Sequence, residues 1–381
     1  MASIMDLLIL GHRGYAARRI ENTISAFELA GETAGIAGVE LDVQIARDGE
    51  VVVAHDGDLR RLADDPRRIV EVPSTELATI PLHGVDRYGQ ELTTVGVPTL
   101  NAVIDSLPAW MKIDIELKSY DDTPRDAPER VARLLADRGG AQPADLGGTG
   151  PRGELPLAER EGAKPAGRGG TGPRAELPLA EREEAKPAGR GGTGPRGELP
   201  LAERVLVSSF DPRLIRRFRR EMLRLQRAGA MAAAPSAASS GAPPAAPIPT
   251  AVIYSEDQEV PWFLRAGLGV LLTGSEIAKP SWRTALGGER SELRGRKHPQ
   301  ERAAHPDSRR RVDRRHRPAG WSRAPQYVWT VNDEDVLRRL MERGVAGVIG
   351  DDPGELVAWA TAIAERSVVR DVDRQPGTRS E

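Results

Sequence analysis

Short apolar runs alternate with amphipathic stretches along much of the chain. The strand-like runs, rich in Val, Ile and Leu, occupy residues 6–12, 38–45, 50–56, 110–118, 204–210, 248–254, 268–274, 326–331 and 346–350. Stretches with the apolar spacing of a helix follow several of them, at residues 21–35, 211–227, 333–344 and 353–366. A strand followed repeatedly by a helix is typical of a parallel sheet covered by helices. Length and number of runs favour an α/β fold, a TIM-like (β/α)8 barrel with low-complexity insertions, although a doubly wound open sheet has a similar signature.

Residues 38–53 form a strand-like pair around an Asp-Gly step at residues 48–49. Asp-Gly predicts a two-residue type I′ turn because it tolerates positive φ. Antiparallel pairing around such a turn places Asp42 opposite His55. Because side chains alternate along a strand, Glu40, Asp42 and His55 are expected on one face, with apolar side chains on the other. A buried pair of carboxylates needs a cation to offset its desolvation.

Two further runs carry polar side chains at or near the ends of expected strands. In KIDIELK, alternation puts Asp114, Glu116 and Lys118 on one face of a buried strand. His12 and Arg13 directly follow the first strand-like run. A parallel barrel holds its functional groups at the carboxyl ends of its strands, so we expect these side chains to meet there.

The residue types that meet there indicate a particular chemistry. Glu40, Asp42 and Glu116 supply three oxygen donors, which suit a hard divalent ion such as Mg²⁺ or Ca²⁺ better than zinc. Arg13 and Lys118 add positive charge at the same place, and a guanidinium matches phosphate oxygens in a two-pronged way. A metal, basic residues and two histidines together describe phosphoester chemistry, in which one imidazole takes a proton and the other gives one.

The overall composition narrows the classes of protein further. The chain has 54 Lys and Arg against 56 Asp and Glu and a formal net charge of -2, so no nucleic-acid partner is expected. It has no cysteine, which excludes disulfides and thiolate chemistry. We expect neither a signal peptide nor stable insertion into a membrane, and we take the protein to be cytoplasmic by default. The sequence indicates no oligomeric state.

Low-complexity segments interrupt the barrel pattern. A 22-residue repeat starts at Gly147, Gly169 and Gly191 and is expected to form a disordered insertion over residues 139–204, with an Arg/Pro-rich interaction segment as the alternative. An Ala/Pro-rich spacer occupies residues 228–247. An Arg/His/Pro-rich tract at residues 289–323 is expected to be irregular and solvated, with a slipped coding frame as one explanation and binding to nucleic acid or an acidic surface as the alternative. The barrel is then expected over residues 1–138, 205–227, 248–288 and 324–366, followed by a disordered tail at 367–381.

Taken together, these motifs resemble the glycerophosphodiester phosphodiesterase family in its short bacterial cytoplasmic form. The resemblance rests on GHRG, ENTISAFELA, GVELDVQIARDGEVVVAHDGDLRRL, VPTLNAVIDSLP, KIDIELK, VLVSSFDP, VWTVND and GVIGDDP. It implies a TIM barrel in which Glu40, Asp42 and Glu116 hold a divalent metal, while His12 and His55 act as acid and base.

The same resemblance implies roles for the flanking residues. Arg13 and Lys118 would hold phosphate, Trp329 would form part of the pocket wall, and Glu21 and Asn22 would support the site. Members of the family hydrolyse glycerophosphodiesters to sn-glycerol 3-phosphate and an alcohol, so the expected partner is a small-molecule glycerophosphodiester.

The chain also departs from the family pattern. Ile20 replaces the usual proline before ENT, and Gly350 stands where the last strand usually has threonine. The tract at 289–323 replaces the helix that should lead into VWTVND, so the barrel wall is expected to be poorly covered there. Two other functions therefore stay open: a phospholipase D-type enzyme of the same superfamily acting on lysophospholipids or sphingomyelin, or a damaged, non-catalytic barrel with an Arg/Pro-rich interaction segment.

Overall fold

The computed structural model of the chain describes residues 7–140, 197–232, 247–256, 265, 267–287 and 324–372. Its contacts divide the chain into one unit, Met1–Gly140 with Gly197–Glu381, and a second unit, Ala141–Arg196. The second unit lies outside the described residues, as do most of the spacer at 228–247 and the whole tract at 289–323. The expectations about those segments stay predictions. In the described ranges, no helix is long and apolar enough to cross a membrane.

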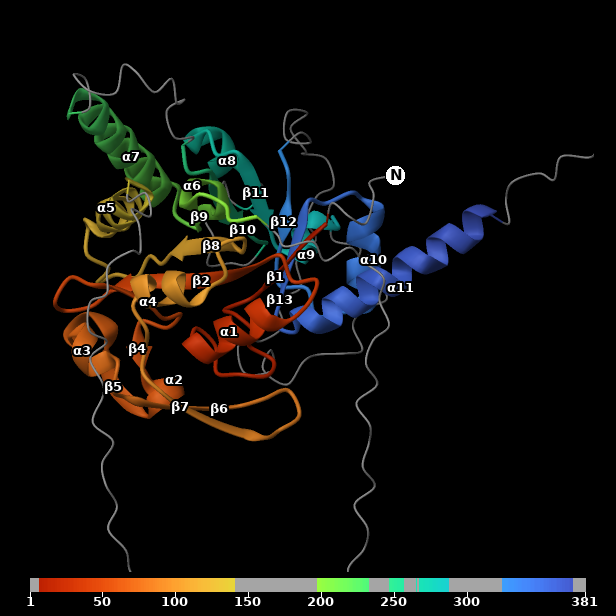
Figure 1. Ribbon diagram of the computed structural model, residues 1–381, viewed down its shortest axis with the longest axis horizontal. Coiled ribbons are helices and arrows are strands. Elements are labelled where there is room, and N and C mark those ends of the chain that lie inside the picture. The colour runs from red at the N-terminus through yellow and green to blue at the C-terminus, as the bar shows by residue number, and fades with distance from the viewer. Residues whose placement is uncertain are drawn as a thin grey trace, which may run out of the picture. The chain divides into compact units, whose positions relative to one another are not determined.

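Eight parallel strands of the described chain form one continuous sheet, which crosses the centre of Figure 1. Neighbouring strands pair in chain order, and β1 pairs with both β2 and the last strand, β13. The strands are β1 (Leu8–Gly11), β2 (Gly38–Ile45), β8 (Lys112–Leu117), β9 (Val205–Ser209), β10 (Thr250–Tyr254), β11 (Ile277–Pro280), β12 (Tyr327–Val328) and β13 (Gly347–Gly350).

The two remaining edges of this sheet meet and close it. Ala278 in β11 bridges Gln326 in parallel, and Ser281 bridges Trp329 just beyond the strands. An open doubly wound sheet would leave two unpaired edge strands instead. The fold is therefore a (β/α)8 barrel, as the alternating pattern predicted.

A helix follows each strand and covers the outside of the barrel. These helices are α1 (Ile24–Glu32), α4 (Leu100–Ser106), α5 (Ala127–Gly140), α7 (Pro212–Ala232), α8 (Leu268–Thr273), α9 (Trp282–Ala285), α10 (Glu334–Glu342) and α11 (Pro353–Val372). Several begin at a side chain that caps the first turn: Thr23, Thr99 and Asp333 each accept a hydrogen bond from a backbone N–H inside the helix. Figure 1 shows α5 and α7 side by side, and the ion pairs Arg217–Glu129 and Arg133–Glu221 join them.

The barrel strands β2 and β8 direct apolar side chains outward and charged ones inward. Val39, Leu41, Ile113 and Ile115 are completely buried within the main hydrophobic cluster, which includes the helix residue Phe27. The alternate positions on the same strands include the acids Glu40, Asp42, Asp114 and Glu116. The interior of such a barrel is normally filled by branched apolar side chains, so buried carboxylates at these positions are costly unless they serve a site.

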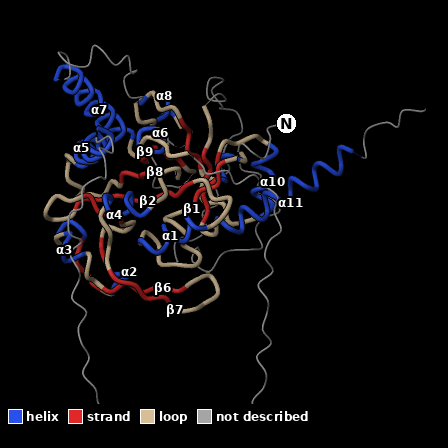
Figure 2. Tube along the Cα trace, viewed as in Figure 1, coloured by secondary structure: helices blue, strands red, loops and turns tan. Residues whose placement is uncertain are grey.

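Between β2 and α4 the chain forms a small insertion beside the barrel. It comprises β3 (Val51–Val53), β4 (Asp58–Leu59), α2 (Arg60–Ala63), β5 (Asp65–Arg68), a 3₁₀ turn (Ile69–Glu71), α3 (Ser74–Leu77), β6 (Pro81–Val85) and β7 (Glu91–Val95). In Figure 2, β6 and β7 run as a two-stranded ribbon apart from the barrel strands. A separate apolar cluster, which includes Leu59, Ile69 and Leu77, holds this insertion together.

The hairpin that follows β2 has a longer loop than predicted. β3 pairs with β2 in antiparallel fashion, but the Gly49 amide donates to the Ala46 carbonyl and the Ala46 amide donates to the Glu50 carbonyl. Gly49 has a φ of 88°. This is the three-residue hairpin loop, in which a type I turn ends on a left-handed residue. The prediction of a two-residue type I′ turn is wrong.

The longer loop also shifts the strand register by one residue. The Ala54 amide, rather than His55, hydrogen-bonds to the Asp42 carbonyl. One cause is that the Asp48 carboxylate accepts hydrogen bonds from the amide and hydroxyl of Ser74, which ties the turn to α3. His55 reaches the site from just beyond the end of β3 instead.

The predicted strand at residues 268–274 is also wrong, because these residues form the short helix α8. Gly267 and Gly274 flank it with positive φ angles of 78° and 66°. Leu271 and Leu272 are 59% and 54% exposed instead of packing in the barrel. A short apolar run cannot be assigned to helix or strand from periodicity alone. The strand in this part of the sheet is β11, which pairs with β10.

Three predicted segment boundaries differ from the observed elements. A short helix α6 (Leu201–Arg204) lies within the last copy of the repeat, and the Arg204 Nε donates to the Met111 carbonyl at 3.0 Å. At the other boundaries, α7 continues past residue 227 to Ala232 and α11 past residue 366 to Val372. The end of the repeat is therefore part of the barrel wall.

Candidate active site

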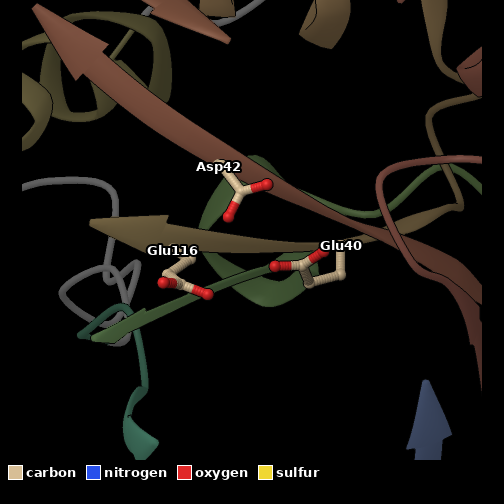
Figure 3. A group of neighbouring side chains, drawn as sticks. All are labelled: Glu40, Asp42 and Glu116. Atoms are coloured by element: carbon tan, nitrogen blue, oxygen red, sulfur yellow. The ribbon is translucent and has the colours of Figure 1, made fainter. Parts of the chain in front are cut away.

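Three acidic side chains converge inside the barrel. Glu40 and Asp42 come from β2, and Glu116 comes from β8, directly opposite Asp42 in the strand register. One carboxylate oxygen from each lies within 4.8 Å of the others, and all three residues are buried. Figure 3 shows the three carboxylates turned toward a common space. An all-oxygen, buried donor set of this kind fits a hard divalent cation.

Basic side chains contact the same carboxylates. The Arg13 Nε lies 3.3 Å from Asp42 Oδ2, and the Lys118 Nζ lies 3.3 Å from Asp42 Oδ1 and 2.9 Å from Glu116 Oε1. Both cations therefore lie at the edge of the acidic cluster, where they could contact a phosphate bound beside it.

The surroundings of Asp42 and Glu40 shift the pKa values of these two acids in opposite directions. Burial raises the pKa of Asp42, but Lys118 and Arg13 outweigh it and hold that pKa well below its usual value. Burial and the negative charge of Asp42 raise the pKa of Glu40 to about 7. A cation bound between the acids would favour the ionised form of Glu40.

Both predicted histidines reach the same cavity, and each is hydrogen-bonded to a carboxylate. His12 follows β1 and its Nδ1 lies 2.7 Å from Asp351 Oδ1. His55 Nδ1 lies 2.7 Å from Asp56 Oδ1. Because Nδ1 of each ring is hydrogen-bonded to a carboxylate, Nε2 is the ring nitrogen that can face the cavity. His12 Nε2 lies 4.0 Å from Glu40 Oε2. Burial and Arg13 lower the pKa of His12, but the Asp351 and Glu40 carboxylates outweigh them and raise it above its usual value.

Glu21 and Asn22 lie where supporting residues were expected. Asn22 donates from Nδ2 to Asp42 Oδ2 at 2.9 Å. Glu21 accepts hydrogen bonds from Arg13 at 2.7 Å and from Arg61 at 2.7 and 2.8 Å. Burial raises the pKa of Glu21, but the two guanidinium groups outweigh it and lower that pKa to about 2. Glu21 is therefore ionised at neutral pH and orients the Arg13 guanidinium.

Both histidines, both cations and two of the three acids line one cavity that opens to solvent. Trp329 lines this cavity, and its indole Nε1 donates to the Lys279 carbonyl at 3.0 Å. Phe210 packs against Trp329 in an edge-to-face arrangement at 5.4 Å and continues this apolar side. The lining residues are His12, Arg13, Glu40, His55, Glu116, Lys118, Phe210, Ile253, Lys279, Trp329 and Ile349.

Sequence reasoning missed the partners of the two histidines. Asp56 follows His55 directly, and Asp351 follows β13, so both positions are at or just beyond strand ends. In a parallel barrel the residues after the strands face the site, which is the signal that could have found Asp351. The strand before Asp56, β3, is antiparallel to β2, so this signal does not apply to Asp56. Arg61 was also missed. Its Nε ion-pairs with Asp56 at 2.6 Å, which links the His55 side of the cavity to Glu21.

Lys279 on β11 is the other residue that was missed. Its ammonium lies 2.7 Å from Asp114 Oδ2 and 3.9 Å from Glu40 Oε1, and it donates to Ser208 Oγ at 3.1 Å. Burial lowers the pKa of Lys279, but Asp114 and Glu40 outweigh it and raise it above its usual value. The incorrect assignment of residues 268–274 as the strand concealed this residue, because β11 was not recognised.

The departures from the family pattern have structural explanations. Ile20 is buried in the apolar cluster of the insertion, where it packs near Gly84. At Gly350, an added Cβ would lie 2.3 Å from the Val331 carbonyl oxygen and 2.7 Å from Leu356 Cδ1. This backbone therefore has no room for the threonine that the resemblance implies. The poor coverage expected near residues 289–323 stays a prediction, because that tract lies outside the described residues.

Comparison with known proteins agrees with this geometry. Residues 12–138 match the sequence model of the glycerophosphoryl diester phosphodiesterase family. A glycerophosphodiester phosphodiesterase of Caldanaerobacter subterraneus subsp. tengcongensis is 33% identical over 116 residues, which are 30% of this chain and 46% of the relative. A lysophospholipase D of Rattus norvegicus is 31% identical over 117 residues, which are 29% of this chain and 36% of the relative. The chain thus spans less than half the length of these curated relatives.

Solved structures extend the likeness to most of the chain. A crystal structure from Silicibacter pomeroyi, named after the same family, has a TM-score of 0.53 and 18% identity, over 95% of this chain and 94% of its own. One from Galdieria sulphuraria has a TM-score of 0.52 and 14% identity, over 93% and 98%. At these identities the likeness concerns the fold, which is the closed barrel described above. Residues 12–138 thus match the model of the family that the motifs predicted.

Proposed function

We propose that this chain hydrolyses glycerophosphodiesters to sn-glycerol 3-phosphate and an alcohol, in a reaction that depends on a divalent metal ion, Mg²⁺ or Ca²⁺. The observation that carries the proposal is the convergence of three buried carboxylates and two carboxylate-bound histidines on one cavity. The match to the family model over residues 12–138 supports the same activity.

In this proposal Glu40, Asp42 and Glu116 hold the metal ion. Such an ion, when bound, offsets the negative charge that develops on the phosphoryl oxygens. Arg13 and Lys118 bind the phosphate from the side of Asp42, where their charged groups already lie. Trp329 and Phe210 shield the reacting bond from solvent on the apolar side of the cavity.

His12 and His55 carry the proton transfers. The oxygen of water, or of the substrate hydroxyl beside the phosphorus, forms a new bond to phosphorus as the bond to the leaving alcohol oxygen breaks, and one imidazole gives that leaving oxygen a proton. If the substrate hydroxyl attacks, water then opens the resulting cyclic phosphate. The other imidazole takes the proton of the attacking oxygen. Asp351 and Asp56 hold the two rings through Nδ1, so that each Nε2 can face the substrate.

Metal dependence is tested by turnover of glycerophosphocholine with and without EDTA. We expect activity to disappear in excess chelator and to return on addition of Mg²⁺ or Ca²⁺. Glu116→Gln removes one charged ligand with little change of shape, so we expect it to weaken metal binding in calorimetry. Full activity in excess chelator would overturn the metal assignment.

The histidine roles are tested by His12→Ala and His55→Ala, each with an expected loss of about 10²- to 10⁴-fold in kcat. His83→Ala is the matched control, because His83 lies on the exposed β6–β7 ribbon and its ion-pair partner within the described ranges is Asp64 at 3.4 Å. We expect the control to keep the activity of the native chain. Unchanged activity in both site variants would reject the acid and base roles.

A second candidate substrate is a lysophospholipid, because one curated relative is named a lysophospholipase D. The phosphate under attack is the same in both substrates. They differ in the glycerol, which carries an acyl chain in the lysophospholipid. We expect glycerophosphocholine to be preferred, because seven of the eleven residues that line the cavity are His, Arg, Lys or Glu, which suits a polar substrate better than an acyl chain. Competition between glycerophosphocholine and lysophosphatidylcholine distinguishes them. Inactivity toward both would favour the non-catalytic alternative, and the cytoplasmic location stays a prediction.

A further inference from the structure

Lys279 is a charged side chain in an unusually buried position. Only 2% of it is exposed, and it is among the largest fully buried side chains of the described chain. A buried ammonium is stable only when nearby groups compensate its lost hydration. Asp114 from β8 does so at 2.7 Å, and Ser208 from β9 accepts a hydrogen bond at 3.1 Å. Side chains from two other barrel strands thus hold one cation in place.

The ammonium has more donors than these partners use. A lysine Nζ carries three N–H groups. Among the described residues, the next contact of Nζ is Glu40 Oε1, and its distance of 3.9 Å is too long for a hydrogen bond. Lys279 also lines the cavity together with Glu40 and His12. One N–H is therefore available to a ligand beside Glu40.

Its position places this donor deeper in the barrel than the other cations. Glu40 pairs with Asp114 in the strand register, two residues before the pair Asp42 and Glu116 that Lys118 contacts. Lys118 and Arg13 thus contact the outer level of the acidic cluster, and Lys279 contacts the inner level. A phosphate lying against the acids could meet cations at both levels.

We propose that Lys279 donates a hydrogen bond to a non-bridging phosphoryl oxygen of the substrate and is the third cation of the phosphate site. This inference rests on the proposed function. The negative charge of a phosphodiester favours this partner over a neutral glycerol hydroxyl, because the attraction between opposite charges adds to the hydrogen bond. Asp114 acts as a positioning residue that holds the ammonium.

The test measures binding as well as turnover. Lys279→Met alone would leave Asp114 buried and unpaired, so the decisive variant is the double substitution Lys279→Met with Asp114→Asn. We expect its affinity for inorganic phosphate and for sn-glycerol 3-phosphate, measured by calorimetry with Mg²⁺ present, to fall by about 10- to 100-fold. Affinity for glycerol should stay unchanged. Asp114→Asn alone keeps the ammonium but removes the charge that holds it, so we expect a smaller loss of phosphate affinity than in the double variant.

Lys112→Met provides a matched control, since Lys112 begins β8 at the opposite end and donates to the Glu203 carbonyl at 2.7 Å. We expect it to leave phosphate affinity unchanged. If the folded double variant binds phosphate as tightly as the native chain, or loses affinity for glycerol alone, the role of Lys279 is rejected. A native chain that neither binds phosphate nor turns over glycerophosphocholine would instead reject the proposed function, so the two failures are distinct.

Discussion

Each candidate catalytic histidine has its own carboxylate partner, and the two partners come from different parts of the chain. Asp56 is next to His55 in sequence, whereas Asp351 follows the neighbouring strand β13 and is 339 residues from His12 in sequence. Asn332 donates from Nδ2 to Asp351, so the carboxylate is itself held in place. A carboxylate on Nδ1 fixes which nitrogen carries the proton and orients the ring.

We expect Asp351→Asn and Asp56→Asn each to lower kcat by about 10- to 1,000-fold with little change in KM. The amide keeps the size of the side chain but removes the charge that stabilises the imidazolium. Steady-state kinetics with glycerophosphocholine checks this. Asp64→Asn is the control, because Asp64 pairs with the exposed His83 and is itself 90% exposed. A rise in KM without loss of kcat would mean that the carboxylates act on binding instead.

At the scale of single elements, the close approach of β13 to the loop after β12 explains why Gly350 is glycine. The Val331 carbonyl oxygen lies 2.3 Å from the place where a Cβ would be. We expect Gly350→Ala to reduce the free energy of unfolding by about 1–3 kcal/mol, because backbone must move to relieve the contact. Urea denaturation measures the change. Gly139→Ala is the control, since an added Cβ there meets nothing within 4 Å. Equal stability of Gly350→Ala and the native chain would show that the strand end adapts freely.

Individual strands and helices show how much of the fold could be predicted from the sequence. The runs of β2 and β8 were recognisable because acidic and apolar residues alternate with period two, and the alternation also predicted that Glu40, Asp42 and Glu116 would meet. The run at 268–274 carried no such alternation, so a buried strand and a short surface helix looked alike. Lys279 was missed for that reason.

The register of the first hairpin could not be read from the sequence either. Asp-Gly favours a two-residue turn, but contacts of Asp48 with Ser74 in α3 select the longer loop. Such contacts join residues that are distant in sequence, and no local propensity includes them. The pairing of His12 with Asp351 is of the same kind, since only closure of the barrel brings β1 beside β13.

At the scale of the whole molecule, ion pairs around the site make stability depend on pH. The pKa of Glu21 falls from 4.5 to about 2 on folding, because the charges of Arg13 and Arg61 outweigh burial. A carboxyl whose pKa is lower in the folded state stabilises it above the unfolded pKa, and this stabilisation is lost as the pH falls from about 4.5 toward 2.

We therefore expect the free energy of unfolding of the native chain to fall by about 2–3 kcal/mol more between pH 7 and pH 3 than that of Glu21→Gln. Urea denaturation at the two pH values measures the difference. Glu342→Gln removes one partner of the exposed pair Arg338–Glu342 and should behave like the native chain within about 0.5 kcal/mol. A parallel pH response of Glu21→Gln and the native chain would contradict the linkage.

The repeat offers a test of which parts of the sequence the barrel needs. The segment ELPLAER occurs in all three copies, and the last one, at residues 198–204, leads directly into β9. Within it the Leu199 amide donates to the Ala109 carbonyl, Leu201 packs against the main core, and Arg204 contacts the Met111 carbonyl. The last copy of the repeat, which leads into β9, therefore contributes contacts to the barrel.

Deleting residues 147–190 removes two copies and keeps the last. The remaining residues 141–146 and 191–196 span up to about 40 Å when extended, which gives the chain length to join α5 to residue 197. Loop length changes stability only weakly, so we expect the melting temperature to change by no more than a few degrees and activity to be kept. Deleting 197–204 instead removes contacts of the core, and we expect it to prevent stable folding. Loss of folding in the first deletion would show that the earlier copies are needed by the barrel itself.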